Sequence, residues 1–427
     1  MSLKRRDFIN LSAIGAGSAI ISGVSSCAQV ENKPETKSIL DSLQPTTDDV
    51  LPISIEERKT RISKAQRLMN EQDIGALLLD AGTSLSYFTG VSWWPSERPM
   101  VTIIPAEGEV SYICPGFEEA RLLEIITIGD KVYPWQEDES PYTQIISALE
   151  DAGINSGKIG IEERMRFFIL DGVKKEAPHF DYVSGDAVTI PCRIVKSSAE
   201  IALMQKATNI TIEAIKVGLL SLKEGGSPSD FSNAVEAAHR KMGARHGFAG
   251  VNFAEASAFP HGSRKPQILK KGDVVLVDCG CSVQGYQSDI SRTIVFGSVP
   301  TSREQEIWDL EKKAQAAGYE AAKIGNALEE VDAAARKVIT DAGFGPDYKL
   351  PGLPHRTGHG IGMDGHEWGN AVRGNKRLLE PGMCFSIEPN ISIVGEFGVR
   401  LEDCVYMTEE GPKWFSQPSP TISQPFV

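Results

Sequence analysis

The 427-residue sequence has no surplus of basic residues. Its 57 acidic residues outnumber its 44 basic ones, which gives a formal net charge of −13, and no basic block follows the first few residues. A nucleic-acid-binding protein needs an excess of Lys and Arg somewhere on its surface. The composition therefore argues against a nucleic-acid partner, whereas an apolar content of 41% is enough for the buried cores of two or three globular domains.

A membrane-spanning run and a cysteine framework are also missing. The weakly apolar stretch from Leu11 to Val24 is rich in Gly, Ala and Ser, and it is too short to span a bilayer core of about 30 Å. Beyond Cys27, the cysteines show no CxxC pair and no regular spacing, and they lie within apolar runs. We therefore expect small buried core residues at all of these positions: Cys114, Cys192, Cys279, Cys281, Cys384 and Cys404.

The N-terminus has the pattern of an export signal. Arg5 and Arg6 precede the weakly apolar stretch, and a twin-arginine pair is the address of the Tat route, which carries folded proteins. The segment Val24-Ser-Ser-Cys27 resembles a lipoprotein processing site, although an ordinary cleaved signal followed by an unmodified cysteine fits the same residues. We expect residues 1–27 to be a Tat-type signal, and the protein to be periplasmic or anchored to the membrane as a lipoprotein through Cys27.

The rest of the chain divides by composition and periodicity. Residues 28–52 are polar and proline-spotted, as expected for a flexible tether, and residues 53–190 alternate helical and strand-like patterns. In residues 196–410 two helices followed by strand-like runs occur twice, which indicates either a duplication or a coincidence of common elements. Residues 411–427 are expected to be a C-terminal tail. The fold class is therefore mixed α/β (α+β).

Four acidic residues stand where a buried core is expected. Asp278 follows an apolar run, and a hairpin would bring Asp289 beside it. Glu388 ends another apolar run. Glu402 shares one face of the strand-like run 398–405 with Arg400, because side chains two positions apart point to the same side of a strand. A lone carboxylate is costly in a core, so each of these acids needs a partner. A salt bridge would satisfy any one of them.

One histidine, His359, lies in the segment Thr357-Gly-His-Gly-Ile-Gly362, whose glycines let backbone and ligand approach closely. Together with the four acids it predicts a two-metal centre. Four carboxylates, two divalent ions and a bridging hydroxide would carry a net charge of about −1, and oxygen-rich ligation with one imidazole suits Mn, Co, Zn or Fe. Two such ions would activate water and stabilise a tetrahedral intermediate.

The predicted ligands occur in an order that resembles the five-ligand set of the pita-bread metallopeptidases: Asp278, Asp289, His359, Glu388 and Glu402. This family includes methionine aminopeptidase, aminopeptidase P and prolidase. Five segments carry the resemblance: Val277-Asp-Cys-Gly280, Ser288-Asp-Ile-Ser-Arg-Thr293, His355-Arg-Thr-Gly-His-Gly-Ile-Gly362, Ser386-Ile-Glu-Pro389 and Val399-Arg-Leu-Glu-Asp403. The resemblance implies a pita-bread catalytic domain with a pseudo-twofold ααββ duplication at 196–410. Residues 53–190 are similar to the N-terminal domain of creatinase and prolidase.

The resemblance also implies a role for each ligand. Asp278 would hold one metal ion and His359 with Glu388 the other, while Asp289 and Glu402 would bridge the two. Glu388 would in addition serve as the proton shuttle for the bridging water.

Further site residues follow from the same resemblance. His261 and His366 match histidines that contact the nitrogen and the carbonyl oxygen of the scissile peptide. His355 matches a histidine near the proline side of the site, and Arg400 matches an arginine of the proline-specific branches.

The expected function is a dinuclear metal-dependent exopeptidase that hydrolyses the Xaa-Pro bond at peptide N-termini. Its cofactors would be two divalent metal ions, with Mn expected first and Co, Zn or Fe as alternatives. Its substrate would be a peptide with proline at the second position. The protein is expected to form a homodimer. The resemblance leaves open the choice between the aminopeptidase P and the prolidase type. Asn390, Gly369 and Asn370 depart from the usual pattern and bear on the shape of the substrate pocket.

Two alternatives share the same fold. A creatinase-like amidinohydrolase works without metal, and a catalytically inactive pita-bread protein binds peptides without cutting them. The five intact ligand positions argue against both.

Overall fold

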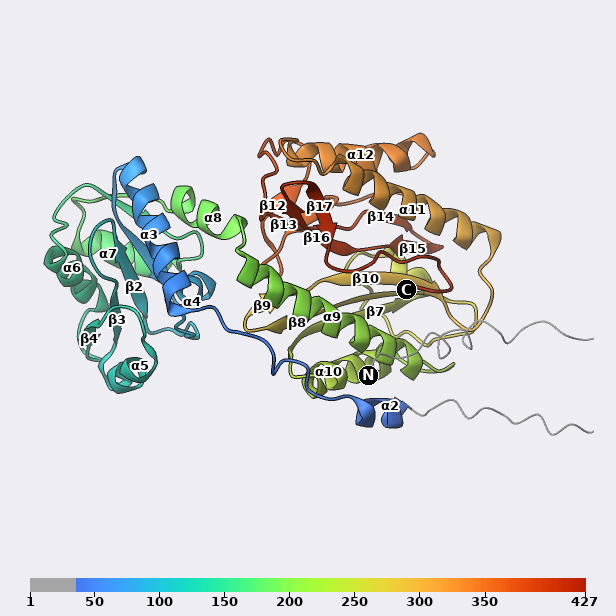
Figure 1. Ribbon diagram of the computed structural model, residues 1–427, viewed down its shortest axis with the longest axis horizontal. Helices are drawn as coiled ribbons and strands as arrows, with labels where there is room; N and C mark the ends of the chain where they lie inside the picture. The colour runs from blue at the N-terminus through green and yellow to red at the C-terminus, as the bar shows by residue number, and fades with distance from the viewer. Residues whose placement is uncertain (1–35) are drawn as a thin grey trace, which may run out of the picture. The chain divides into compact units, whose positions relative to one another are not determined.

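The computed structural model describes residues 36–427 and divides into two compact units (Figure 1). The N-terminal unit is Pro52–Ile194, and the C-terminal unit is Val195–Val427 together with the segment before Pro52. The predicted export signal and Cys27 lie outside the described residues. Of the helices described, none combines the length and the apolar character that crossing a bilayer requires.

The N-terminal unit is built on a six-stranded sheet. Its strands stand in the order β4 (Lys131–Trp135), β3 (Ser111–Pro115), β2 (Val101–Pro105), β1 (Ile74–Asp80), β5 (Lys158–Ile161) and β6 (Asp181–Ser184). The pairs β1–β2 and β2–β3 are antiparallel, and the other neighbours are parallel. Strands β1, β2 and β3 are buried along nearly their whole length, and strands buried on both faces read as near-continuous apolar sequence.

Six helices complete this unit: α3 (Ile55–Gln72), α4 (Thr83–Thr89), α5 (Glu119–Ile125), α6 (Pro141–Asp151), α7 (Phe167–Glu176) and α8 (Asp186–Ile194). The start of α3 is capped as its sequence predicts, since the Glu57 N–H donates to Ser54 Oγ over 3.1 Å. Helices α6 and α7 bury Ile145 and Val173 in the core under the sheet. The unit continues past residue 190 because α8 runs on to the buried Ile194.

The C-terminal unit contains two similar halves. In the first, α9 (Ser198–Ser221) and α10 (Pro228–Lys241) pack on a sheet of β7 (Arg245–Phe253), β8 (Val274–Val283), β9 (Tyr286–Gln287) and β10 (Ile290–Val295). In the second, α11 (Ser302–Ala321) and α12 (Leu328–Asp341) pack on strands β11 (Gly358–Gly360), β12 (Glu367–Ala371), β13 (Cys384–Ile387), β14 (Asn390–Ile393), β15 (Phe397–Arg400), β16 (Asp403–Thr408) and β17 (Gly411–Trp414). The predicted duplication of two helices and following strands is confirmed (Figure 1).

The run 398–405 does not form one strand, as the sequence analysis expected. β15 ends at Arg400 and pairs with β14, whereas β16 begins at Asp403 and pairs with β13. Between the two strands, the Glu402 N–H donates to the Ser291 carbonyl over 3.2 Å, and the Glu402 carbonyl accepts from Arg292 over 2.9 Å. Simple alternation along one strand therefore does not explain why Arg400 and Glu402 face the same interior.

Part of the expected flexible tether and the expected C-terminal tail both pack within the C-terminal unit. Within 36–51, α2 (Thr36–Ser42) contacts α9 and α10, because Ile39 and Leu43 are apolar and buried. Within 411–427, Phe415 and Ile422 are buried, and Arg292 donates to the carbonyls of Gln417 and Pro425. The tether was expected from its polar composition, which does not register a few well-placed apolar side chains.

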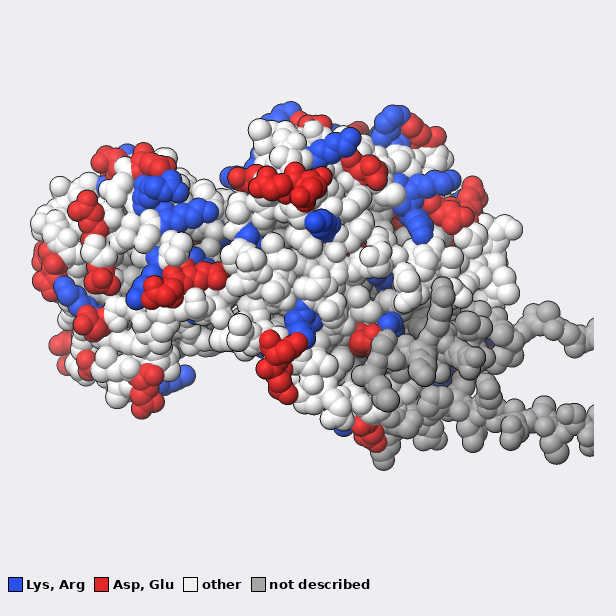
Figure 2. Space-filling model, in the orientation of Figure 1, with Lys and Arg blue, Asp and Glu red and all other residues white. Residues whose placement is uncertain are grey.

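The charged and sulfur-containing residues are distributed as in an ordinary globular protein. On the face drawn in Figure 2, Lys and Arg side chains are interspersed with Asp and Glu on both units. The described cysteines are all free and buried, which confirms the expectation of core positions.

Candidate metal centre

The hairpin of β8 and β10 brings the first two predicted ligands together. Asp278 pairs with Ser291 in the register, and Asp289 immediately precedes β10. Asp278 lies in the middle of β8 and not at its end, because β8 continues through the apolar residues up to Val283. Ser291 Oγ lies 3.1 Å from Asp278 Oδ1 and 2.8 Å from Glu402 Oε2, so one hydroxyl connects the hairpin to the Glu402 segment.

His359 lies on the short strand β11 and not in a glycine loop. A Cβ atom at Gly358 would lie 1.9 Å from the Ser386 carbonyl oxygen, and one at Gly360 would lie 1.6 Å from that of Trp368. Glycine is therefore required at both positions because the adjoining chain segments run too close for a side chain. His359 Nδ1 lies 3.0 Å from the Gly360 carbonyl oxygen. Since a carbonyl only accepts, Nδ1 carries the proton and Nε2 keeps its lone pair.

The imidazole of His359 faces three of the four acids. Its Nε2 lies 3.1 Å from Glu388 Oε1, 3.7 Å from Asp289 Oδ2 and 3.8 Å from Glu402 Oε1. Ligand atoms of Asp278, Asp289 and Glu402 also lie within 4.8 Å of one another. The structure thus brings all five predicted ligands into one cluster, from positions up to 124 residues apart in the chain (402 − 278).

The electrostatics of this cluster fit bound cations. Asp289 Oδ1 and Glu402 Oε1 are buried and accept no hydrogen bond. Burial, reinforced by the neighbouring carboxylates, raises the pKa of both acids well above the usual range. Burial also opposes ionisation of Glu388, but His359, His355 and Arg400 together outweigh it and lower the pKa of this carboxyl. A group of buried acids with free lone pairs is costly by itself, and divalent cations would neutralise it.

The cluster opens into a cavity of about 920 Å³. All predicted site residues line it: His261, Asp278, Asp289, His355, His359, His366, Glu388, Arg400 and Glu402. Arg400 pairs with Asp278 and also donates to Ser291 Oγ over 2.9 Å. The residues at the two departures from the usual pattern, Asn390 and Gly369-Asn370, are not among the described residues that line the cavity.

Arg356 is a cavity residue that the sequence analysis missed. Its Nη2 lies 3.1 Å from His366 Nδ1. Because a guanidinium only donates, His366 Nδ1 is the acceptor, and the neutral ring carries its proton on Nε2. The pKa of His366 is lowered to about 4, first by desolvation and then by His359 and Arg356, so the ring is neutral at pH 7. Its position inside the His355–Gly362 segment was the only signal in the sequence.

His355 presents an unused nitrogen. Its Nδ1 lies 2.7 Å from the Arg356 carbonyl oxygen, whereas its Nε2 is buried and has no hydrogen-bond partner. Burial is the main cause of a lowered pKa, which keeps this ring neutral as well. A buried polar atom at a cavity wall is costly unless a ligand satisfies it.

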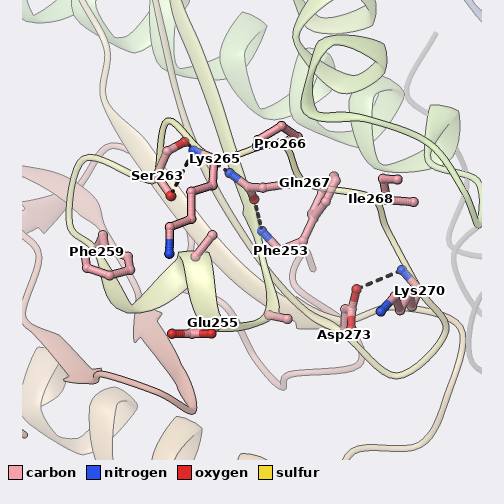
Figure 3. Close-up of a pocket in the computed structure, with 12 residues that line it drawn as sticks. Phe253, Glu255, Phe259, Ser263, Lys265, Pro266, Gln267, Ile268, Lys270 and Asp273 are labelled. Atoms are coloured by element: carbon pink, nitrogen blue, oxygen red, sulfur yellow. Dashed lines mark hydrogen bonds between the residues drawn. The ribbon is translucent and has the colours of Figure 1, made fainter.

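His261 lies on the loop between the 3₁₀ helix η2 (Ala254–Ala258) and β8. Gln267 anchors this loop, since its Oε1 accepts from the Phe253 N–H over 2.8 Å (Figure 3). Arg400 holds the other end by donating to the Pro260 carbonyl over 3.1 Å. The hollow in Figure 3, about 350 Å³, is lined by this loop and by η2.

Two serines complete the supports that the sequence analysis missed. Ser386 Oγ accepts from the His359 N–H over 3.0 Å and donates to Glu388 Oε1 over 3.1 Å. Ser291 Oγ in the same way lies within hydrogen-bond distance of both Asp278 and Glu402. No local pattern distinguishes these serines from others, because each has a partner from a distant segment, His359 for Ser386 and Glu402 for Ser291.

The fold and the cluster define a two-domain protein with a buried acidic and histidine centre of the metallopeptidase kind. Residues 202–409 match metallopeptidase family M24, and residues 61–195 match the creatinase/prolidase N-terminal domain. The chain belongs to metallopeptidase family M24. The family resemblance predicted from the sequence is thereby confirmed.

Individual relatives agree with this assignment. A Xaa-Pro dipeptidase of Lactobacillus delbrueckii subsp. lactis is 30% identical over 366 residues, which cover 84% of this chain and 97% of the relative. The crystal structure of a prolidase from Thermococcus sibiricus is similar with a TM-score of 0.77 and 29% identity, covering 84% of this chain and 97% of that one. A dipeptidase from Pyrococcus horikoshii has a TM-score of 0.76 and 29% identity, covering 84% and 98%. The mixed α/β and pita-bread fold is confirmed.

Proposed function

We propose that this protein is a metal-dependent exopeptidase that hydrolyses the bond between an N-terminal residue and a following proline. The observation that carries the proposal is the cluster of five ligand residues in one cavity of a family M24 fold. The relatives named above are called Xaa-Pro dipeptidase, prolidase and dipeptidase, so an Xaa-Pro dipeptide is the first substrate to test.

The residues would hold two divalent metal ions. His359 and Glu388 would hold one ion, Asp278 the other, and Asp289 and Glu402 would bridge them. The hard oxygen donors with one imidazole support Mn as the first metal to test, before Co, Zn or Fe. When bound, these ions would activate water for attack and stabilise the negative charge that develops.

The protein's own groups would handle the proton and orient the peptide. Glu388 would take up a proton from the attacking water and deliver it to the leaving amine. His366 Nε2–H would donate to the oxygen on which charge develops. His261 would contact the scissile nitrogen, and the unpartnered Nε2 of His355 would accept a hydrogen bond on the proline side, because Nδ1 faces the Arg356 carbonyl.

The test combines metal analysis of the purified protein with digestion of Xaa-Pro dipeptides and longer Xaa-Pro peptides. The proposal predicts cleavage at the Xaa-Pro bond, loss of activity on chelation and its return with Mn²⁺. A creatinase-like activity would survive chelation, and a peptide-binding protein would retain the peptide uncut. Either result would refute the proposal. Comparing the two peptide lengths separates the prolidase from the aminopeptidase P type.

Export and assembly are further parts of the proposal. The twin arginines and Val24-Ser-Ser-Cys27 support export by the Tat route to the periplasm, with Cys27 as a lipid attachment point. A homodimer is proposed from the family resemblance, and light scattering of the purified protein tests it.

A further inference from the structure

A buried ion pair on α12 lies close to the cavity but belongs to none of the predicted site residues. Arg336 Nη2 lies 3.1 Å from Asp332 Oδ1, and the two side chains are 8% and 2% exposed. Their spacing of four residues places them on the same face of the helix. Burying two charges costs more than their attraction returns unless their other donors and acceptors are also satisfied. The remaining partners of this pair therefore indicate what it does.

Arg336 uses all five of its N–H donors. Nε and Nη2 each reach Asp332, over 3.3 Å and 3.1 Å. The other three donors bind backbone carbonyls of the segment that follows α12: Asp347 over 2.6 Å, Leu353 over 2.9 Å and His355 over 2.7 Å. One planar guanidinium thus fixes the path of the chain as it approaches the cavity, and the single ammonium of a lysine could not reproduce this pattern.

Asp332 extends the contact to the metal centre. Its Oδ1 accepts from the Thr357 N–H over 3.1 Å and from Thr357 Oγ1 over 2.8 Å. The Thr357 carbonyl in turn accepts from the Glu388 N–H over 2.7 Å. A single residue therefore stands between the ion pair and the ligand Glu388.

The segment held by the pair carries much of the cavity wall. Pro354, His355 and Arg356 all line the cavity, and Arg356 fixes the tautomer of His366. A displacement of this segment would move the His355 ring, release His366 and shift the backbone at Glu388 together. One pair of side chains on α12 is thus connected by hydrogen bonds to the segment that carries His355, Arg356 and Thr357.

We propose that Asp332 and Arg336 are positioning residues of the metal centre, which hold residues 353–357 so that His355, Arg356 and Glu388 face the cavity. The expected change in kcat rests on the proposed function. The expected change in Mn²⁺ affinity does not depend on that function. Neither residue touches the cluster directly, so both act through Thr357 and the backbone.

The experiment compares the variants Arg336→Lys, Asp332→Ala, Asp332→Asn and Thr357→Val with the wild-type protein. Mn²⁺ affinity is measured by titration of the metal-free protein, and kcat and KM are measured on an Xaa-Pro dipeptide at saturating Mn²⁺, well below each melting temperature. Arg336→Lys and Asp332→Ala should weaken Mn²⁺ binding by about 10- to 100-fold. They should also lower kcat by about 10²-fold, because a small misplacement of catalytic groups is costly.

Two of these variants should have smaller effects, and one further variant is the control. Asp332→Asn keeps an oxygen that accepts from the Thr357 N–H, and Thr357→Val removes only the hydroxyl contact, so both should lose less than Asp332→Ala. Lys337→Met, at the next position on the same helix, removes an exposed ion pair with Asp341 and should behave as wild type.

Variants of Asp332 and Arg336 that melt earlier, yet keep the wild-type Mn²⁺ affinity and kcat, would overturn the proposal and leave the pair as a stabilising contact only. A wild-type protein that binds Mn²⁺ but cuts neither Xaa-Pro dipeptides nor longer Xaa-Pro peptides would refute the proposed function, and the Mn²⁺ titrations of the variants would still decide the positioning role. A wild-type protein that binds none of Mn²⁺, Co²⁺, Zn²⁺ and Fe²⁺ would overturn both.

Discussion

The rings of His359 and His366 lie against each other, with centroids 3.9 Å apart and planes tilted by 36°. His359 faces three acids through Nε2, whereas Arg356 turns the N–H of His366 to its other nitrogen. The two neighbouring imidazoles therefore differ in what they offer: His359 offers a lone pair that can bind a cation, and His366 offers an N–H that can donate to an anion.

His366→Ala should lower kcat strongly while the metals stay bound. Losing one donor to the developing oxyanion costs on the order of 10²–10³ in kcat, with an equal loss in kcat/KM if ground-state binding is spared. Metal content, melting temperature and kcat are measured on the same variant. Full metal occupancy with an unchanged kcat would remove His366 from the mechanism, and loss of metal would make it a ligand.

Asp289→Ala should abolish activity and metal binding together. Asp289 has ligand atoms near those of both His359 and Asp278, and without it the repulsion between two cations is unscreened. Metal analysis after dialysis and a Xaa-Pro dipeptide assay check this. The exposed Asp341→Ala is the matched control and should keep both properties. A variant of Asp289 that retains two tightly bound ions and full turnover would contradict the assignment.

His239 should make the protein less stable in mild acid. It is fully buried, lies 3.0 Å from His246 between the two Nδ1 atoms, and burial followed by His246 lowers its pKa to about 3. As the pH falls below about 6.5, the unfolded chain binds this proton first, so the contribution of His239 to the free energy of unfolding is present above pH 6.5 and lost toward pH 3.

The comparison is made with His239→Gln, which cannot titrate. Over this pH window the free energy of unfolding of the wild type should fall more steeply, by up to about 1.4 kcal/mol per pH unit. The exposed His179→Gln is the control and should follow the wild type. Identical slopes for all three proteins would show that His239 is not the group responsible.

Replacing both Arg5 and Arg6 by Lys should leave the precursor in the cytoplasm, because the Tat receptor reads the arginine pair and not its charge. Cell fractionation with an antibody to the protein measures this. Normal export of the double variant would count against the Tat route. In the same assay, Cys27→Ala should release the protein from membranes if the cysteine is acylated and should change nothing if the signal is simply cleaved.

Much of the fold followed from local patterns. Helix α9 begins directly after a capping box of Ser197 and Glu200, a pattern that the sequence alone displays, and both of its hydrogen bonds form. Strands buried on both faces were visible as apolar runs. The strand β7 was missed because only part of it is buried, so that neither an apolar run nor a clean alternation marks it.

The sequence by itself determined which residues could bind metal, because the identity and order of the five ligands carry the chemistry and no fold is needed to read them. Only the tertiary structure decided what supports them. Ser291 meets Glu402 across 111 positions, and Asp332 meets Thr357 across 25. Such contacts depend on how distant segments of the chain come together. A local sequence pattern predicts which face of an element a side chain occupies, but not which distant residue it contacts.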